Sequence, residues 1–250
     1  MNILLVNDDG IQSPLLHLLC RSAAARGHRV TVCAPATQQS AKAHSFTIFT
    51  PVAVHPWIME GAAEAWAVEG TPVDCTRLGL MALCQDRVEL VISGINGGLN
   101  VGLATFVSGT VGAAREAAFQ NVPAMAVSMA LGAPAETRHF FVDWTVTLGE
   151  RLAGYPFPEQ AVCNVNLPAR SMLQLRPPVM CPICRNVWTD GYERRESPRG
   201  GSYFWLKAEE APSAPTTGTD VDCLNKGHIT CTFLAPEGCC QEDYADFLDF

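Results

Sequence analysis

The chain opens with MNILLVNDDG (residues 1–10), an apolar run that ends in two adjacent carboxylates. The branched apolar residues of 3–6 predict a buried strand. Asp8 and Asp9 repel each other when they are half-buried, and either protonation of one of them or a hard cation such as Mg²⁺ or Mn²⁺, bound through oxygen, relieves that repulsion. Gly10 then lets the backbone turn. A solvated turn in which an aspartate caps the next helix explains the same residues, so this stretch alone leaves both interpretations open.

Strand-like and helical patterns alternate after this opening. Residues 14–26 place leucine and alanine at helical spacing, and residues 28–34 have the composition of a second strand. Strand, helix and strand at this spacing form a βαβ unit, which implies a parallel sheet. The alternation continues with helices over 71–84, 111–119 and 136–152 and strands over 89–93, 124–129 and 162–165. The sequence therefore predicts an α/β fold with a doubly wound, mostly parallel sheet.

Two regions depart from this alternation. Residues 47–68 predict a β-hairpin that turns around Gly61 and projects from the sheet. Residues 173–210 contain paired prolines, a charged loop and the strand-like segment 202–206, which together predict β-arms outside the main sheet. A two-stranded arm cannot bury both of its faces alone, so we expect it to pack against another subunit. Residues 211–218 are expected to form an exposed loop.

The composition limits the possible partners. The chain has 250 residues, of which 48% are hydrophobic and 17% charged, as in a globular protein with a substantial core. Its formal net charge is −8 and it has no run of Lys or Arg, so we expect no nucleic-acid partner. No basic leader precedes residue 3, and no apolar stretch approaches the roughly 20 residues of a membrane helix. We therefore expect no membrane partner and a cytoplasmic location.

The eleven cysteines allow two interpretations. Several lie in apolar runs, where a small buried thiol is expected, and free thiols are typical of a reducing compartment. Cys181 and Cys184, followed by Cys239 and Cys240, offer a four-thiolate zinc site as the alternative. The second pair is adjacent and not spaced as in a zinc ribbon, which favours free thiols.

Three loops are expected to meet at the carboxyl ends of the strands, where open α/β sheets bind ligands. Asp8 and Asp9 end the first strand, and Asn96 lies in the glycine-rich loop after the strand at 89–93. If these two strands are neighbours, the two carboxylates and the amide converge, and Ser40, after the second strand, adds a hydroxyl. Such an all-oxygen set suits Mg²⁺, Mn²⁺ or Ca²⁺ and not Zn²⁺.

The segment SGTVG (108–112) precedes a predicted helix and has the composition of an anion-binding helix start. An ordinary capped helix explains it equally well when it is considered alone. Beside a divalent cation, a phosphate is the natural anion, because the metal and the helix end can hold one oxyanion between them. None of the six histidines lies in these motifs, and His44, the nearest, is expected to have a structural role.

These motifs, in this order, resemble the SurE (survival protein E) family of metal-dependent nucleotide phosphatases. The matching stretches are ILLVNDDG (3–10), the serine loop (34–41), GTPVDC (70–75), VISGINGGLNVG (91–102), SGTVGAA (108–114), NVNLP (164–168), YFWL (203–206) and GTDVDCLNKGHIT (218–230). The resemblance implies one domain over 1–250, with a Rossmann-like core over about 1–170 and β-hairpin arm extensions. It also implies a homodimer or homotetramer, formed by exchange of the arm and the C-terminal segment within about 171–250.

The resemblance further implies an activity: hydrolysis of nucleoside monophosphates by a 5′-nucleotidase, which leaves open whether 3′-nucleotides or polyphosphate are also cleaved. It implies one divalent metal ion per subunit (Mg, Mn or Ca), held by Asp8, Asp9, Ser40 and Asn96. Asp8 and Asp9 are the expected catalytic residues, one of which orients a metal-bound water or takes its proton. The residues expected at the phosphate are Asn96, Gly97, Ser108, Gly109 and Thr110.

Two segments depart from the family pattern. ATQQSA (36–41) lacks the usual Asp and Arg of the serine loop and its final glycine, and GLATFV (102–107) lacks the polar residues and the tyrosine that usually precede SGTV. The contacts to the base and the sugar therefore remain open.

Two other functions were weighed against the nucleotidase. A phosphatase that forms an aspartyl-phosphate generally has Asp-x-Asp, and here Gly10 occupies the second aspartate position. A receiver-like, Mg²⁺-binding signalling module is about half this length and needs a strand-end Asp with a later partner Lys, which this chain does not show. The first turn also lacks the Gly-x-Gly-x-x-Gly of a dinucleotide-binding protein.

Overall fold

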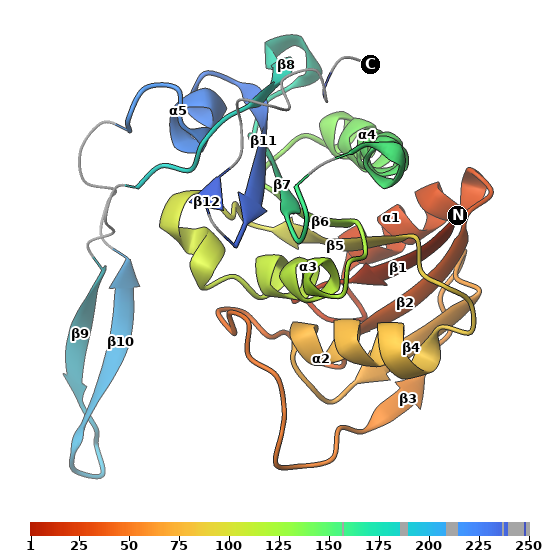
Figure 1. Cartoon of the computed structure of the whole chain (residues 1–250). Helices are drawn as coiled ribbons and strands as arrows, with labels where there is room; N and C mark the ends of the chain where they lie inside the picture. The colour runs from red at the N-terminus through yellow and green to blue at the C-terminus, as the bar shows by residue number, and fades with distance from the viewer. Residues whose placement is uncertain (157, 186–189, 209–214, 237, 240–247, 249–250) are drawn as a thin grey trace.

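The computed structural model describes residues 1–156, 158–185, 190–208, 215–236, 238–239 and 248. Its main sheet consists of β1 (Asn2–Val6), β2 (Arg29–Pro35), β3 (Val54–Pro56), β4 (Glu64–Val68), β5 (Leu90–Gly97), β6 (Ala124–Met129), β7 (Val162–Leu167), β8 (Arg176–Met180), β11 (His228–Ala235) and β12 (Gly238–Cys239). The strand order is β12-β11-β7-β6-β5-β1-β2-β4-β3, and β8 pairs with β11 (Figure 1).

Parallel pairing dominates this sheet. β1 pairs in parallel with both β2 and β5, and β4, β6 and β7 extend the parallel pairing on either side. Within the described part of this sheet, the antiparallel pairs are β3 with β4, β7 with β11, and β11 with β12. The chain moves outward from β1 to β2 and later returns to β5 on the other side of β1, so the strand order reverses between β1 and β5. The predicted doubly wound, mostly parallel sheet is confirmed.

Helices cover both faces of the sheet: α1 (Pro14–Ala25), α2 (Pro72–Leu78), α3 (Gly109–Phe119) and α4 (Ala135–Gly154), with the short α5 (Asp220–Asn225) beside β11. Ile3 and Leu5 pack into one apolar cluster with residues of α1 and α4. Leu4 and Val6 pack into a second cluster with residues of α2 and α3. Because successive residues of a strand point to opposite faces, this alternation buries β1 completely, as expected for a central parallel strand.

Helix α2 begins as predicted and ends earlier. Thr71 is its N-cap: its hydroxyl accepts a hydrogen bond from the Asp74 backbone N–H at 3.1 Å, and Asp74 accepts one from the Thr71 N–H at 2.9 Å. This reciprocal capping box satisfies two of the free N–H groups at the helix start. A helix to residue 84 was expected, but the α-helix ends at Leu78 and a π-helical turn, η1 (Gly79–Leu83), follows it.

The hairpin expected over 47–68 is present but does not project. β3 and β4 are antiparallel around a turn that contains Gly61 at φ 88°. β4 also pairs in parallel with β2, so the hairpin extends the edge of the main sheet, and the expectation of a projecting hairpin was wrong. The physical reason is that Ala65 and Ala67 are apolar and small, and they are buried in the cluster that contains α1.

The predicted arm is formed by β9 (Asp190–Glu196) and β10 (Ser202–Ala208), which make a separate antiparallel pair. Figure 1 shows this hairpin extending away from the body of the molecule. β8 lies in the same predicted arm region but joins the main sheet beside β11, so the expectation was wrong for that segment. Of the loop expected over 211–218, residues 211–214 lie outside the described residues.

The described cysteines are free thiols, and Cys181 and Cys184 are buried. Burial raises the pKa of the Cys181 thiol, which keeps it in its unreactive, protonated form. Among the described residues, no cluster of three His, Cys, Asp or Glu side chains could hold a metal. Cys240 and the side chain of Cys239 lie outside the described part of the chain. In that same part, no helix combines the length and the apolar character that a membrane span requires.

The core predicts a contrast between two adjacent residues of α4. Phe141 is fully buried and stacks on Trp144, with ring centroids 5.9 Å apart, whereas Phe140 is 37% exposed. We expect Phe141→Ala to lower the free energy of unfolding by about 3–5 kcal/mol and Phe140→Ala by less than about 1 kcal/mol, as measured by urea denaturation. An equal loss in the free energy of unfolding for the two variants would contradict the difference in burial between Phe141 and Phe140.

Candidate active site

Asp8 and Asp9 follow β1 directly, at the point where the strand order reverses. Asp8 is 5% exposed, and its Oδ1 accepts a hydrogen bond from the Thr110 hydroxyl at 2.7 Å. Asp9 is half-buried, and its Oδ2 accepts a hydrogen bond from the Gly97 N–H at 3.1 Å. One carboxylate therefore contacts the first turn of α3, and the other contacts the end of β5.

The surroundings of Asp8 disfavour its ionised form. Burial raises the pKa of this carboxyl, the hydrogen bond from Thr110 lowers it, and the negative charge of Asp9 raises it again, with a net increase. Desolvation and a like charge thus act together against two ionised carboxylates. A bound cation removes both penalties, because it supplies opposite charge and oxygen coordination.

Asn96 is the next-to-last residue of β5, which continues to Gly97, so the expectation of a loop after residue 93 was wrong at this point. β1 and β5 are adjacent parallel strands, and Val6 lies opposite Ser93. This adjacency is the condition under which Asn96 was expected to lie near Asp8 and Asp9. The side-chain amide nitrogen of Asn96 donates to the Gly98 carbonyl at 2.8 Å. This bond orients the amide and uses its nitrogen, so the carbonyl oxygen is the atom able to bind a cation.

The loop after β2 lies against the carboxylates through its backbone. The Gln39 N–H donates to the Asp8 carbonyl at 2.8 Å. Gly10 adopts a φ of +99°, and a Cβ at this position would lie 3.3 Å from the Pro35 carbonyl oxygen, which explains the glycine. Ser40 is exposed, one residue beyond the contact with Asp8, and its hydroxyl accepts a hydrogen bond from the Gln38 side chain at 3.1 Å.

Helix α3 presents its N-terminus to the same carboxylates. It begins at Gly109, two residues before the predicted start, and the hydroxyl of its N-cap Ser108 accepts a hydrogen bond from the Val111 N–H at 3.2 Å. A Cβ at Gly109 would lie 3.1 Å from the Cβ of Asp8, so only glycine allows this approach without a shift. The positive end of the helix dipole therefore lies beside Asp8.

His44 has the structural role that the sequence suggested. Its Nε2 lies 2.9 Å from Oε2 of the buried Glu116, and its ring stacks on Phe119 with centroids 5.4 Å apart. Arg77 donates to the other oxygen of Glu116 at 2.7 Å. These contacts fasten the loop after β2 to helices α2 and α3.

A buried asparagine network, which was not predicted from the sequence, holds the loop between Asn96 and Ser108. The N–H of Asn100 donates to Oδ1 of Asn166 at 2.8 Å, and its carbonyl accepts from the side chains of Asn164 and Asn166, each at 3.0 Å. Its own side chain donates to the Ser128 hydroxyl at 2.8 Å. The alternation of Asn164 and Asn166 within a buried strand was the available signal, because it places both amides on one face.

Asp220 fixes the same loop from its other side. This fully buried carboxylate at the start of α5 accepts hydrogen bonds from the N–H groups of Gly102 and Cys184, both at 2.7 Å. Burial raises the pKa of Asp220 even though backbone N–H groups stabilise its charge. The loop that joins the proposed metal and phosphate elements is thus held by buried polar groups on two sides.

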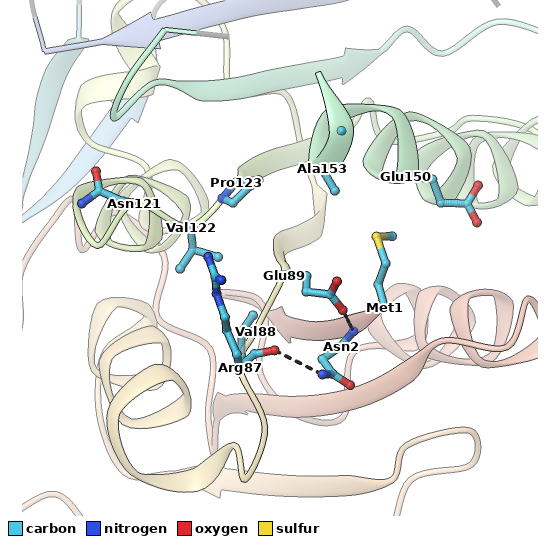
Figure 2. A pocket seen from close by; sticks show the side chains of 11 residues that line it. Met1, Asn2, Arg87, Val88, Glu89, Asn121, Val122, Pro123, Glu150 and Ala153 are labelled. Atoms are coloured by element: carbon cyan, nitrogen blue, oxygen red, sulfur yellow. Dashed lines mark hydrogen bonds between the residues drawn. The ribbon is translucent and has the colours of Figure 1, made fainter. Parts of the chain in front are cut away.

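A cavity of about 680 Å³ opens beside the carboxylates. Asp9, Gly97 and Gln38 line it, together with residues of α1 and the first turn of α4. A second cavity, of about 740 Å³, lies at the amino ends of the strands (Figure 2), where Asn2 donates to the Glu89 carboxylate and the Arg87 carbonyl. That cavity and Asp9 therefore lie at opposite ends of the parallel strands.

Comparisons with known proteins agree along almost the whole chain. The family model for survival protein SurE matches residues 3–190. The "5′-nucleotidase SurE" of Nitratidesulfovibrio vulgaris (strain DP4) is 42% identical over 238 residues, which cover 94% of this chain and 93% of the relative. The "5′-nucleotidase SurE" of Synechococcus sp. (strain JA-3-3Ab) is 36% identical and covers 95% and 92%. The crystal structure of the SurE protein from Aquifex aeolicus matches with a TM-score of 0.77 at 28% identity, over 94% and 93% of the two chains.

The asparagine network predicts unequal effects of two similar substitutions. Asn166→Leu leaves the buried Asn100 N–H without its acceptor, and we expect it to lower the free energy of unfolding by about 1–3 kcal/mol. Asn164→Leu should lower the free energy of unfolding by a smaller amount, because Asn166 still bonds the Asn100 carbonyl. In addition, Oδ1 of Asn164 is buried without a partner in the described structure, so its removal leaves no donor unpaired. Urea denaturation of both variants measures the difference, and the reverse order would refute the network.

Proposed function

This chain belongs to the survival protein SurE family, and from that membership we propose how its site acts as a 5′-nucleotidase. The protein is a metal-dependent phosphomonoesterase that converts nucleoside monophosphates into nucleoside and inorganic phosphate. The observation that supports this function most strongly is the contact between the Asp8 carboxylate and the first turn of α3. It supports a cation site at the carboxylates beside an anion site at the start of the helix. The receiver-like module and the aspartyl-phosphate phosphatase are not favoured by these relatives.

We propose that Asp8, Asp9, Ser40 and Asn96 hold one divalent ion, Mg²⁺, Mn²⁺ or Ca²⁺, per subunit. Two carboxylates with neutral oxygens form a hard donor set, and burial of Asp8 beside Asp9 raises its pKa, a cost that a divalent ion would relieve. When it is bound, such an ion supplies charge to polarise the phosphoryl group and lowers the pKa of a coordinated water. Only two of the four proposed ligands are acidic, in line with the absence of larger acidic clusters from the described residues.

The protein groups proposed at the phosphate are those of Asn96, Gly97, Ser108, Gly109 and Thr110. Phosphoryl transfer requires an in-line nucleophile and neutralisation of charge on the equatorial oxygens. We expect the Gly109 N–H at the start of α3 to donate to those oxygens, because the Val111 N–H bonds the Ser108 hydroxyl and the Thr110 N–H stabilises Asp8. Thr110 holds Asp8 in one orientation through their hydrogen bond, and Asp9, the more exposed carboxylate, orients the attacking water or accepts its proton.

Replacement of Asp9 tests this function. Asp9→Asn keeps an oxygen for the Gly97 N–H but removes the charge, so we expect at least about a hundredfold loss of kcat with an intact fold. The assay is release of inorganic phosphate from a panel of 5′- and 3′-nucleoside monophosphates and polyphosphate, with Mg²⁺, Mn²⁺ or EDTA. Asp143→Asn, an exposed change on α4, is the control and should leave turnover unaltered. Undiminished activity of Asp9→Asn would refute the assignment.

We also propose that the protein forms one domain, with a core of about 1–170, and a homodimer or homotetramer through about 171–250. The support is the apolar surface of the arm: Tyr203 and Trp205 alternate with Phe204 and Leu206 along β10, and all four are 42–60% exposed. Both faces of the hairpin thus lack cover within the described chain, and a second copy is the proposed occupant. Of the C-terminal segment expected to exchange, residues 240–247 and 249–250 lie outside the described residues.

The arm predicts the mass of the particle in solution. Wild-type protein should have the mass of two or four chains by light scattering, and Phe204→Asp combined with Trp205→Asp should reduce it, because charge on both faces opposes burial. Phe140→Asp, on α4, is a control outside the arm and should leave the mass unchanged. A one-chain mass for the wild type would contradict the proposal.

A cytoplasmic location is a further proposal. It is supported by the described cysteines, all nine of which are free thiols. Such thiols persist in reducing compartments.

A further inference from the structure

The proposed reaction assigns no role to most residues that line the cavity beside Asp8 and Asp9. We propose that it binds the nucleoside part of the substrate, with the Arg138 guanidinium stacked on the base. This inference rests on the proposed nucleotidase function and adds the site that selects the substrate. Its lining comes from Asp9, Gln12, Ser13, Pro14, Leu15, Leu18, Gln38, Gly97, Arg138 and His139.

The position of the cavity determines which part of a substrate can enter it. Asp9 and Gly97 line it and also belong to the proposed metal and phosphate sites. When the phosphate of a substrate is bound at these residues, the nucleoside attached to it therefore extends from the mouth of this cavity. α1 and α4 border the cavity on one face of the sheet, whereas α3, which meets the phosphate, packs on the other. The volume of about 680 Å³ lies within the usual range for small-ligand sites.

The walls of the cavity suit a flat aromatic ring. Leu15 and Leu18 are three residues apart on α1, so they share one face of the helix, and both are half-buried. Arg138 and His139 are exposed in the first turn of α4. A guanidinium is planar and stacks on aromatic faces, and an imidazole ring can do the same. A base can thus lie between an apolar surface and a planar cation.

The polar groups of the lining suit the edge of a neutral base. The side-chain amides of Gln12 and Gln38 each supply a donor and an acceptor without net charge. Gln38 also donates to the Ser40 hydroxyl, which links the cavity to a proposed metal ligand. These uncharged donors and acceptors suit a neutral base.

The test compares AMP with ribose 5-phosphate, which has the same phosphate and sugar but no base. Arg138→Ala should lower kcat/KM for AMP roughly tenfold, mainly through KM, and leave kcat/KM for ribose 5-phosphate within about twofold. Arg138→Phe should retain most of the preference for AMP, because a ring can replace the stacking but not the charge. Arg87→Ala, in the cavity at the opposite edge of the sheet, is the matched control and should change neither substrate.

A binding measurement separates this inference from catalysis. Calorimetric titration with adenosine in EDTA needs no metal and no turnover, and we expect Arg138→Ala to weaken binding by the same roughly tenfold factor. If wild-type enzyme hydrolyses neither phosphate ester, the proposed function fails. If it hydrolyses both while Arg138→Ala affects them equally or not at all, the function stands and the nucleoside pocket is refuted.

Discussion

The mutual repulsion of two adjacent carboxylates is the constraint on which this structure depends. Asp8 is buried at the end of the central strand, and Asp9 follows it within reach of β5. Burial and like charge both oppose ionisation of Asp8, and hydrogen bonds from the Thr110 hydroxyl and from backbone N–H groups offset only part of that cost. A cation bound between the two carboxylates would relieve it, which is why we propose the cation site at the carboxyl ends of these strands.

The surrounding fold serves to hold loops around that edge. Backbone bonds join the loop after β2 to Asp8, and Asn166 and Asp220 fix the loop between Asn96 and Ser108 through buried hydrogen bonds. These groups are not among the proposed cation or phosphate ligands, yet they fix the loop that joins Asn96 to the start of α3. Buried polar groups of this kind fix one geometry, because any alternative would leave them unpaired. The strands supply a rigid frame, and the polar network positions the loops on it.

The sequence could predict what depends on local pattern. The apolar run before Asp8 and the helical spacing after it indicate β1 and α1, and the strand-end position of Asn96 places it near the carboxylates. Contacts between distant segments could not be predicted in this way: that β4 would pair with β2, or that β8 would join β11, depends on which edges meet in space. The role of Asp220 was hidden for the same reason, because its partner Gly102 is 118 residues away.

The most direct test of the cation site is anomalous diffraction from crystals soaked in Mn²⁺. We predict one anomalous peak per chain, about 2.0–2.3 Å from carboxylate oxygens of both Asp8 and Asp9 and close to the side-chain oxygen of Asn96. The same crystals soaked in EDTA should lose the peak without a change in fold. A peak elsewhere in the chain, or none at saturating Mn²⁺, would contradict the claim that these carboxylates are kept together to hold a metal ion.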